Sequence, residues 1–184
     1  MSNSHSSQGP AALAFKPDPS SKKKKGEHKP IYAEVFTQKP THKSGVGCIH
    51  LLVNPFAGKR KGKKIGEQVK ELLEKEGKTV EIHFSAHSGH LIEVAESIQA
   101  QANDVFAVVG GDGSLSEVIT GRMMATSEGC ELFALIPAGT GNSVANDLGL
   151  TSTEQAVRSI LHGTYQNLDL AKVEMVEGLP GSEK

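Results

Sequence analysis

The chain has 184 residues, of which 37% are hydrophobic, 22% are charged and 4% are aromatic, and it contains no tryptophan. This length suits one α/β domain with a tail, whereas two full domains would be cramped. No stretch approaches the ~20 apolar residues of a membrane-spanning helix. The first residues, MSNSHSSQGP, lack the charged start and apolar core of a secretory signal peptide. Cys48 and Cys130 match no metal-ligand spacing and are too few for a disulfide framework, so we expect a cytoplasmic protein.

The net charge of −1 conceals a division of the chain into a basic arm and an acidic remainder. Residues 1–45 hold eight lysines and three acidic residues, a net charge of +5, which leaves −6 for the rest. The arm is also rich in proline and serine and has little apolar surface to bury, so residues 1–44 are predicted to be disordered. The run Lys22–Lys25 is either a solvated tether, a peripheral contact with anionic membrane lipid, or a nuclear localisation signal.

From Gly45 onward, short apolar runs alternate with stretches of helical periodicity. Strands are predicted at residues 46–53, 79–84, 104–109, 132–136 and 165–173. Helices are predicted at 63–76, 88–102, 114–125 and 151–163, with a short one starting near Asn142. Thr151 and Glu154 have the spacing of a capping box for the last long helix. Four consecutive βα units with strands apolar throughout predict an α/β fold with a doubly wound, mostly parallel, Rossmann-like sheet.

Unusual residues follow three of the predicted strands. The segments are Asn54-Pro55-Phe56-Ala57-Gly58-Lys59-Arg60-Lys61-Gly62, then Gly110-Gly111-Asp112-Gly113-Ser114, then Pro137-Ala138-Gly139-Thr140-Gly141-Asn142. Ligands bind at the carboxyl ends of the strands in such sheets, so these loops are expected to lie side by side. This convergence is stronger evidence for a site than any one loop.

The second loop combines glycines with the start of a helix, which favours a phosphate group. Asp112 would repel phosphate unless it holds Mg²⁺, directly or through water, or accepts a proton from an attacking hydroxyl. Otherwise Asp112 only caps the helix in a Gly-Asp-Gly turn. Glu117 likewise has an alternative interpretation, because Ser114-x-x-Glu117 has the spacing of a capping box.

The first loop holds five basic residues between positions 59 and 64, which favours an anionic ligand. In the third loop, Asn142 is either part of the site or a helix N-cap. The chain contains neither a Walker A motif nor a dinucleotide G-x-G-x-x-G motif. The histidines show no metal-ligand spacing.

The segments NPFAGKRKG, VVGGDGSLSEV and IPAGTGNSVANDLG, in this order, resemble the catalytic domain shared by diacylglycerol kinases, sphingosine and ceramide kinases and their bacterial lipid-kinase relatives. The resemblance spans about residues 46–173. NAD kinases share the GGDG turn but are not expected to carry the other two motifs. The resemblance thus implies a fold of the lipid-kinase and NAD-kinase type.

This resemblance implies transfer of the ATP γ-phosphate to a lipid hydroxyl of a sphingoid base, ceramide or diacylglycerol, with Mg²⁺. Asp112 matches the position proposed as general base or as part of the Mg²⁺–water network, and no residue is directly assignable as a metal ligand. The positions that match ATP-binding residues are Asn54, Pro55, Phe56, Gly58, Gly110, Gly111, Gly113, Ser114, Glu117, Gly139, Thr140, Gly141 and Asn142. The segment 85–89 resembles a further nucleotide-side loop more weakly.

The domain organisation is expected to be the arm at 1–44, the nucleotide-binding domain at 45–174, and a tail at 175–184. Family members continue here into a β-sandwich domain that holds the lipid, and this domain is expected to be absent. The alternative function is therefore a non-catalytic nucleotide-binding module or fragment. Expected partners are ATP, a lipid alcohol, an anionic membrane surface and a second copy in a homodimer, with no nucleic acid.

Overall fold

A computed structural model gives the structure of the protein and describes residues 41–42, 45–125, 132–168 and 170. Its centre is a four-stranded parallel sheet in the order β3-β2-β4-β5. The strands are β2 (Ile49–Val53), β3 (Val80–Phe84), β4 (Val105–Gly110) and β5 (Leu132–Pro137). Every residue of the two central strands, β2 and β4, is buried, as their unbroken apolar runs require. The predicted doubly wound parallel α/β fold is confirmed.

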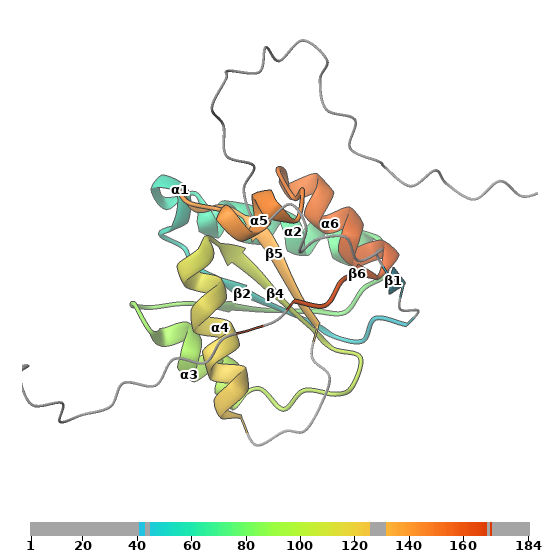
Figure 1. Ribbon diagram of the computed structural model, residues 1–184, viewed down its shortest axis with the longest axis horizontal. Helices are drawn as coiled ribbons and strands as arrows, with labels where there is room; N and C mark the ends of the chain where they lie inside the picture. The colour runs from blue at the N-terminus through green and yellow to red at the C-terminus, as the bar shows by residue number, and fades with distance from the viewer. Residues whose placement is uncertain (1–40, 43–44, 126–131, 169, 171–184) are drawn as a thin grey trace, which may run out of the picture. The chain divides into compact units, whose positions relative to one another are not determined.

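Helices cover both faces of this sheet (Figure 1). α2 (Gly62–Lys75) and α6 (Thr153–His162) pack on one face, over Ile49, Leu51 and Val53 of β2. α3 (His90–Ser97) and α4 (Asp112–Met124) pack on the other, over Leu52 and Phe106. Because successive strand residues point to opposite faces, one strand supplies both cores. Two short segments, α1 (Ala57–Arg60) and α5 (Ser143–Asp147), follow β2 and β5.

The helix predicted at 88–102 is shorter in the structure, at His90–Ser97. It ends because Ile98 adopts an extended conformation, with φ −71° and ψ 125°. The guanidinium of Arg122 from α4 donates to the carbonyl oxygens of Ala95 and Ile98, each at 2.7 Å. These contacts satisfy carbonyls that the end of α3 would otherwise leave without a partner. A long-range contact therefore sets this boundary.

α4 begins at Asp112, two residues before the predicted start. Its spacing predicts an apolar face with Leu115, Val118, Ile119 and Met123, and Val118 is buried with Leu115 packed on the same core. Met123 is 57% exposed, whereas Gly121 and Arg122 are buried. A Cβ atom at Gly121 would lie 2.2 Å from the carbonyl oxygen of Ile92 in α3. Close backbone packing of Gly121 on α3, together with the buried Val118, thus orients α4.

The capping residue predicted for α6 is wrong by one position. Ser152, not Thr151, is the N-cap, and its hydroxyl accepts a hydrogen bond from the amide of Gln155 at 3.2 Å. The Gln155 side chain in turn accepts from the amide of Thr151 at 2.8 Å. The side chains of Ser152 and Gln155 thus accept backbone amides on each other's side of the helix start, and Gln155 takes the role that was predicted for Glu154.

The predicted fifth strand does not join the parallel sheet within the described residues. Only β6 (Thr164–Tyr165) is a strand there, and it pairs antiparallel with β1 (Thr41–His42) in a separate two-stranded sheet. β1 falls inside the arm that was predicted to be disordered, so that prediction is wrong for these two residues. The rest of the arm before Thr41, and the tail 175–184, lie outside the described residues.

Candidate nucleotide-binding site

The three loops predicted to converge do meet, and glycine backbones form the contact between the second and third. A Cβ atom at Gly111 would lie 2.6 Å from the carbonyl oxygen of Gly141, and one at Gly139 would lie 2.7 Å from the Cα of Gly111. The amides of Ala138 and Gly139 both donate to the carbonyl oxygen of Gly110, at 2.9 and 3.0 Å. No larger residue fits at Gly111 or Gly139 without moving backbone.

The first loop joins this assembly through Asn54. Its side-chain Nδ2 donates to the hydroxyl of buried Ser114 at 3.3 Å, and its side-chain Oδ1 accepts from the backbone amide of Phe56 at 3.0 Å. Gly58 approaches the third loop so closely that a Cβ atom would lie 2.2 Å from the carbonyl oxygen of Ala138. Asn54 thus links the first loop to the second, and Gly58 links it to the third.

A left-handed turn follows Asn54-Pro55-Phe56. Gly58, Lys59 and Arg60 have φ values of 54°, 60° and 66°. Left-handed conformations cost a residue with a side chain about 1–2 kcal/mol. Two consecutive cationic residues are held in this conformation at the rim of the loop cluster, and both side chains are exposed. Strain of this kind concentrates at ligand-binding segments.

Asp112 occupies the first turn of α4 and caps α5 from there. Its carboxylate accepts the amide of Ser143 at 2.9 Å with Oδ2 and the amide of Val144 at 3.1 Å with Oδ1. The hydrogen bond from the Ser143 amide, followed by that from Val144, holds the pKa of Asp112 below its ordinary value despite partial burial. The carboxylate is therefore ionised at neutral pH, and it keeps lone-pair capacity beyond its bonds to Ser143 and Val144.

Glu117 does not take part in a capping box, so that alternative is wrong. Its Oε1 accepts the amide of Gly89 at 3.1 Å, in the loop between β3 and α3. Gly89 has φ 82° and directly precedes α3. Glu117 thus ties the segment 85–89, which resembled a nucleotide-side loop only weakly, to the glycine turn at the start of α4.

Asn142 does not cap α5 either. Its side-chain oxygen accepts the amide of Gly139 at 3.1 Å, and its side-chain amide donates to the carbonyl oxygen of Gly139 at 3.0 Å. It therefore closes the third loop on itself and leaves the cap of α5 to Asp112. Thr140 and Gly141 are exposed in this loop. Phe56 is 59% exposed, so its ring is available to a ligand.

The N-terminus of α4 faces the same loop cluster. No described side chain caps it, and Gly111, the residue before it, is extended. The first amides of an α-helix have no partner within the helix, and they carry partial positive charge. The amides at Asp112, Gly113 and Ser114 are accordingly suited to an anion such as phosphate. A Cβ atom at Gly113 would meet nothing within 4 Å.

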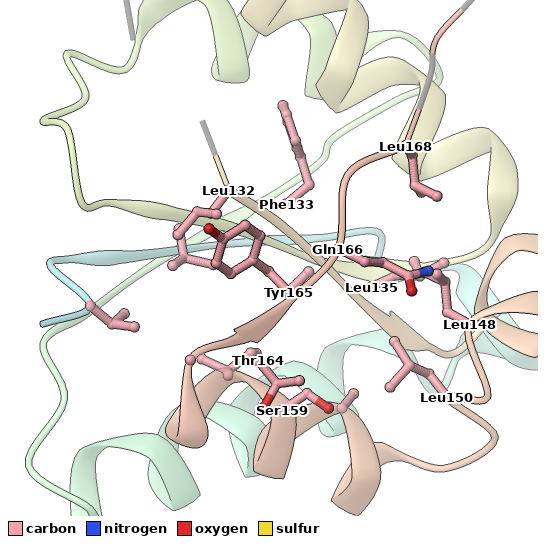
Figure 2. A pocket seen from close by; sticks show the side chains of 16 residues that line it. Leu132, Phe133, Leu135, Leu148, Leu150, Ser159, Thr164, Tyr165, Gln166 and Leu168 are labelled. Carbon is pink, nitrogen blue, oxygen red and sulfur yellow. The ribbon is translucent and has the colours of Figure 1, made fainter. Parts of the chain in front are cut away.

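A pocket of about 220 Å³ lies elsewhere, between β5, α6 and the segment 163–168 (Figure 2). Leu132, Leu135 and Ile160 are among its walls, and none of the described residues that line it is charged. It therefore does not suit a phosphate ligand. Phe133 and Leu168, at its edge, are 37% and 43% exposed. No helix in the described part of the chain is long and apolar enough to span a membrane.

Sequence reasoning missed the backbone groups that complete the site. The amides of Ser143 and Val144 and the carbonyl of Ala138 carry no sequence signal, because every residue type supplies them. The left-handed conformations of Lys59 and Arg60 were also missed, since neither residue type favours them. Of the three residues in that turn, only Gly58 is of a type that favours a left-handed conformation.

Comparison with known proteins matches residues 48–173 to the diacylglycerol kinase catalytic domain. Sphingosine kinase B of Dictyostelium discoideum is 31% identical over 131 residues, which cover 68% of this chain and 17% of that protein. Sphingosine kinase 1 of Arabidopsis thaliana is 30% identical over 156 residues, which cover 80% of this chain and 32% of the relative.

A solved structure from Bacillus anthracis str. Sterne, described as a candidate diacylglycerol kinase, has the same fold. It superposes with a TM-score of 0.53 at 21% identity, covering 63% of this chain and 41% of that one. The chain thus spans less than half the length of each of these relatives.

Proposed function

Because this chain belongs to the lipid kinases that share the diacylglycerol kinase catalytic domain, we propose that it forms the nucleotide-binding part of an enzyme that phosphorylates a lipid. The γ-phosphate of ATP would pass to a hydroxyl group of a sphingoid base, ceramide or diacylglycerol. The names of the relatives, which include sphingosine kinases and ceramide kinases, support this class of acceptor.

The observation that carries the proposal is the glycine-to-glycine packing of Gly111 on Gly139 beside the uncapped start of α4. We assign the phosphates of ATP to the amides of this turn. The residues proposed to surround the nucleotide are Asn54, Pro55, Phe56, Gly58, Gly110, Gly111, Gly113, Ser114, Glu117, Gly139, Thr140, Gly141 and Asn142. Lys59 and Arg60 at the rim add positive charge, which favours a polyanionic ligand.

Asp112 is the proposed catalytic residue, and its geometry favours one of its two expected roles. A general base works best with a pKa near the operating pH. The amide of Ser143 instead lowers the pKa of Asp112, so the carboxylate is a weak base. Mg²⁺ needs only one or two carboxylates together with substrate phosphates, and the free lone pairs of Asp112 fit that requirement. When bound, Mg²⁺ would neutralise charge on the transferred phosphoryl group.

The chain's own groups would then act mainly by positioning. Two backbone amides fix the Asp112 carboxylate, and Asn54 fixes the first loop against Ser114. Holding reactants in line supplies much of the rate enhancement in phosphoryl transfer.

A non-catalytic nucleotide-binding module is the second candidate. One observation favours it: both carboxylate oxygens of Asp112 already serve as the cap of α5, which is a sufficient structural role. The proposed partners beyond ATP, namely an anionic membrane surface reached by Lys22–Lys25 and a second copy of the chain, remain predictions. The lysine run lies outside the described residues.

The test combines calorimetry of ATP·Mg²⁺ binding with a radiolabelled phosphorylation assay on sphingosine, ceramide and diacylglycerol. Gly113→Ala is the informative variant for binding. Its Cβ meets no protein atom within 4 Å and alanine favours a helix, so stability should rise by about 0.5–1 kcal/mol. ATP affinity should nevertheless fall at least about tenfold, because the methyl group would stand where the phosphates approach.

Asp112→Asn is the informative variant for turnover. The asparagine side chain retains an oxygen that can cap α5, so ATP binding should stay within a few fold while phosphorylation of the lipid is lost. Full turnover in this variant would exclude a catalytic role for Asp112. ATP binding without any labelled lipid would favour the module, and unchanged ATP affinity in Gly113→Ala would contradict the placement of the phosphates.

A further inference from the structure

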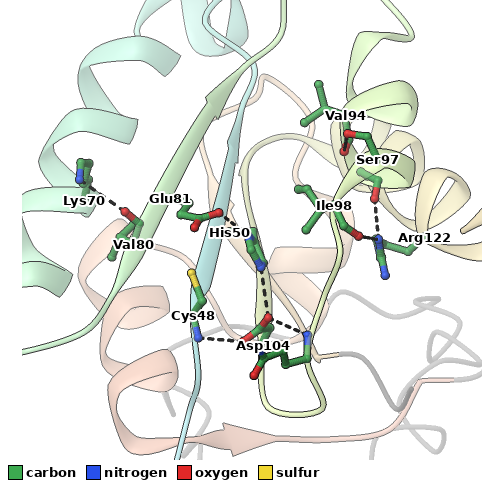
Figure 3. A network of polar contacts seen from close by, with 12 residues as sticks. Cys48, His50, Lys70, Val80, Glu81, Val94, Ser97, Ile98, Asp104 and Arg122 are labelled. Carbon is green, nitrogen blue, oxygen red and sulfur yellow. Dashed lines mark hydrogen bonds and ion pairs between the residues drawn. The ribbon is translucent and has the colours of Figure 1, made fainter. Parts of the chain in front are cut away.

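A second polar cluster lies toward the amino ends of the strands, opposite the end that carries the three loops. It consists of Cys48, which directly precedes β2, His50 in β2, Glu81 in β3, and Asp104, which directly precedes β4 (Figure 3). Cys48 and His50 share one face of β2, and the parallel register places Glu81 beside His50. The cluster is not part of the proposed nucleotide site.

Three of its side chains offer metal-ligand atoms close together. The Sγ of Cys48, the Nδ1 of His50 and a carboxylate oxygen of Glu81 all lie within 4.8 Å of one another. The Nδ1 of His50 is 3.3 Å from Oε2 of Glu81. Two ligands each about 2.0 Å from a tetrahedral ion would lie about 3.3 Å apart. Nδ1 and Oε2 thus already have the separation that one shared ion imposes.

The surroundings of His50 are an independent observation that favours a cation site here. The residue is 5% exposed, and its Nδ1 has no hydrogen-bond partner, although the carboxylate of Glu81 is near. Its other nitrogen, Nε2, lies 3.3 Å from Oδ2 of Asp104. A buried polar atom that lacks a partner is rare and needs an explanation. Here the atom lies 3.3 Å from a carboxylate oxygen, to which an Nδ1 lone pair cannot bond in the tautomer that carries its proton on Nε2.

Asp104 holds the imidazole in the orientation that metal-binding histidines adopt. The amides of Cys48 and Gln101 both donate to its carboxylate at 2.8 Å. Burial alone would raise the pKa of Asp104, but these two amides and His50 outweigh it and hold the pKa below its ordinary value. The carboxylate can therefore accept a hydrogen bond from Nε2–H, and in that tautomer the Nδ1 lone pair is free. Histidine ligands commonly donate their second N–H to a carboxylate in this way.

The chemistry of the donors selects the kind of ion. The carboxylates of Glu81 and Asp104 lie close to Cys48 and concentrate negative charge around these donors. This excess of negative charge favours a cation among them. A set of one thiolate, one imidazole and one carboxylate suits Zn²⁺, whereas Mg²⁺ and Ca²⁺ prefer oxygen ligands alone.

We propose that Cys48, His50 and Glu81 bind one Zn²⁺ ion, with Asp104 orienting the imidazole and a water molecule in the fourth position. Cys48 is half-buried and Glu81 exposed, so the ion can enter from solvent. The ion would cross-link β2 to β3 and, through Asp104, to the segment before β4. It would serve as a structural clamp at the end of the sheet remote from the nucleotide loops.

The test uses the full-length chain, freed of metal and kept reduced with a phosphine. Zn²⁺ binding is measured by calorimetry, and Co²⁺ is used as a spectroscopic probe, because a thiolate ligand gives Co²⁺ a charge-transfer band. We expect one ion per chain and a thiolate band. Cys48→Ser and Glu81→Gln should each weaken binding at least about tenfold. The matched controls, Cys130→Ser and Glu96→Gln at an exposed position of α3, should bind as the parent does.

Circular dichroism verifies that each variant is folded. Equal Zn²⁺ affinity in the parent and in folded Cys48→Ser would overturn the proposal and leave His50 as a protonated partner of two carboxylates. Should Cys48→Ser fail to fold, the Co²⁺ spectrum of Cys130→Ser decides. A thiolate band there supports the site at Cys48, and its absence overturns the proposal.

Discussion

The two ends of the central sheet are organised by different means. At the carboxyl end, the loops meet backbone to backbone, and the contacts are made by Gly111, Gly139 and Gly58, with Asp112 bonded to backbone amides. At the amino end, the cluster of Cys48, His50, Glu81 and Asp104 is built mainly from side chains. The comparison teaches that the carboxyl end, where we propose that phosphates bind, depends on the absence of side chains at its glycines, whereas the amino end depends on the identity of its side chains.

Gly62→Ala tests whether the carboxyl end of the sheet depends on the absence of side chains, and its expected effect is the largest. The new Cβ would lie 1.9 Å from the carbonyl oxygen of Asn54, which is backbone and cannot rotate away. We expect a loss of about 3 kcal/mol in the free energy of unfolding, measured by urea denaturation, together with loss of ATP binding. Lys64→Ala, at an exposed position of the same helix, is the control. Unchanged stability in Gly62→Ala would mean that the first loop shifts freely.

Asp104→Asn tests, in the absence of metal, whether the cluster at the amino end depends on the identity of its side chains. One carboxylate oxygen becomes an amide group, so a backbone amide of Cys48 or Gln101 loses its acceptor. We expect a loss of about 2 kcal/mol in the free energy of unfolding in the presence of a chelator. Asp147→Asn, at an exposed position in α5, is the control. ATP affinity should not change, and a parallel loss of ATP affinity would show that the two ends are coupled.

Acid titration of Asp112 measures how much its negative charge stabilises the fold, and its expected effect is the smallest of the three. Because the Ser143 amide lowers the pKa of Asp112 in the folded state, the ionised carboxylate stabilises the fold above its unfolded pKa of about 4. That contribution is lost as the pH falls through the lower folded pKa. The parent should exceed Asp112→Asn by about 1 kcal/mol in the free energy of unfolding at neutral pH, and the difference should shrink as the pH falls from the unfolded pKa through the lower folded one. A difference independent of pH in urea denaturation would contradict this.

The sequence by itself determined the four strands of the parallel sheet and the loops that meet at its carboxyl edge. Unbroken apolar runs predicted β2 and β4, and three motifs directly after strands predicted loops that meet, because parallel strands end at one edge. Glycine and asparagine have few other uses at such turns, so their types were informative.

Only the tertiary structure decided which groups those residues contact. The spacing of Ser114 and Glu117 suggested a local cap, but Glu117 bonds Gly89, and Asp112 rather than Asn142 caps α5. The cysteine spacing suggested no metal site, yet strand register brings Glu81 to Cys48 and His50. The physical reason is that local rules describe hydrogen bonds within a few residues, whereas these contacts join segments that meet only when the sheet forms.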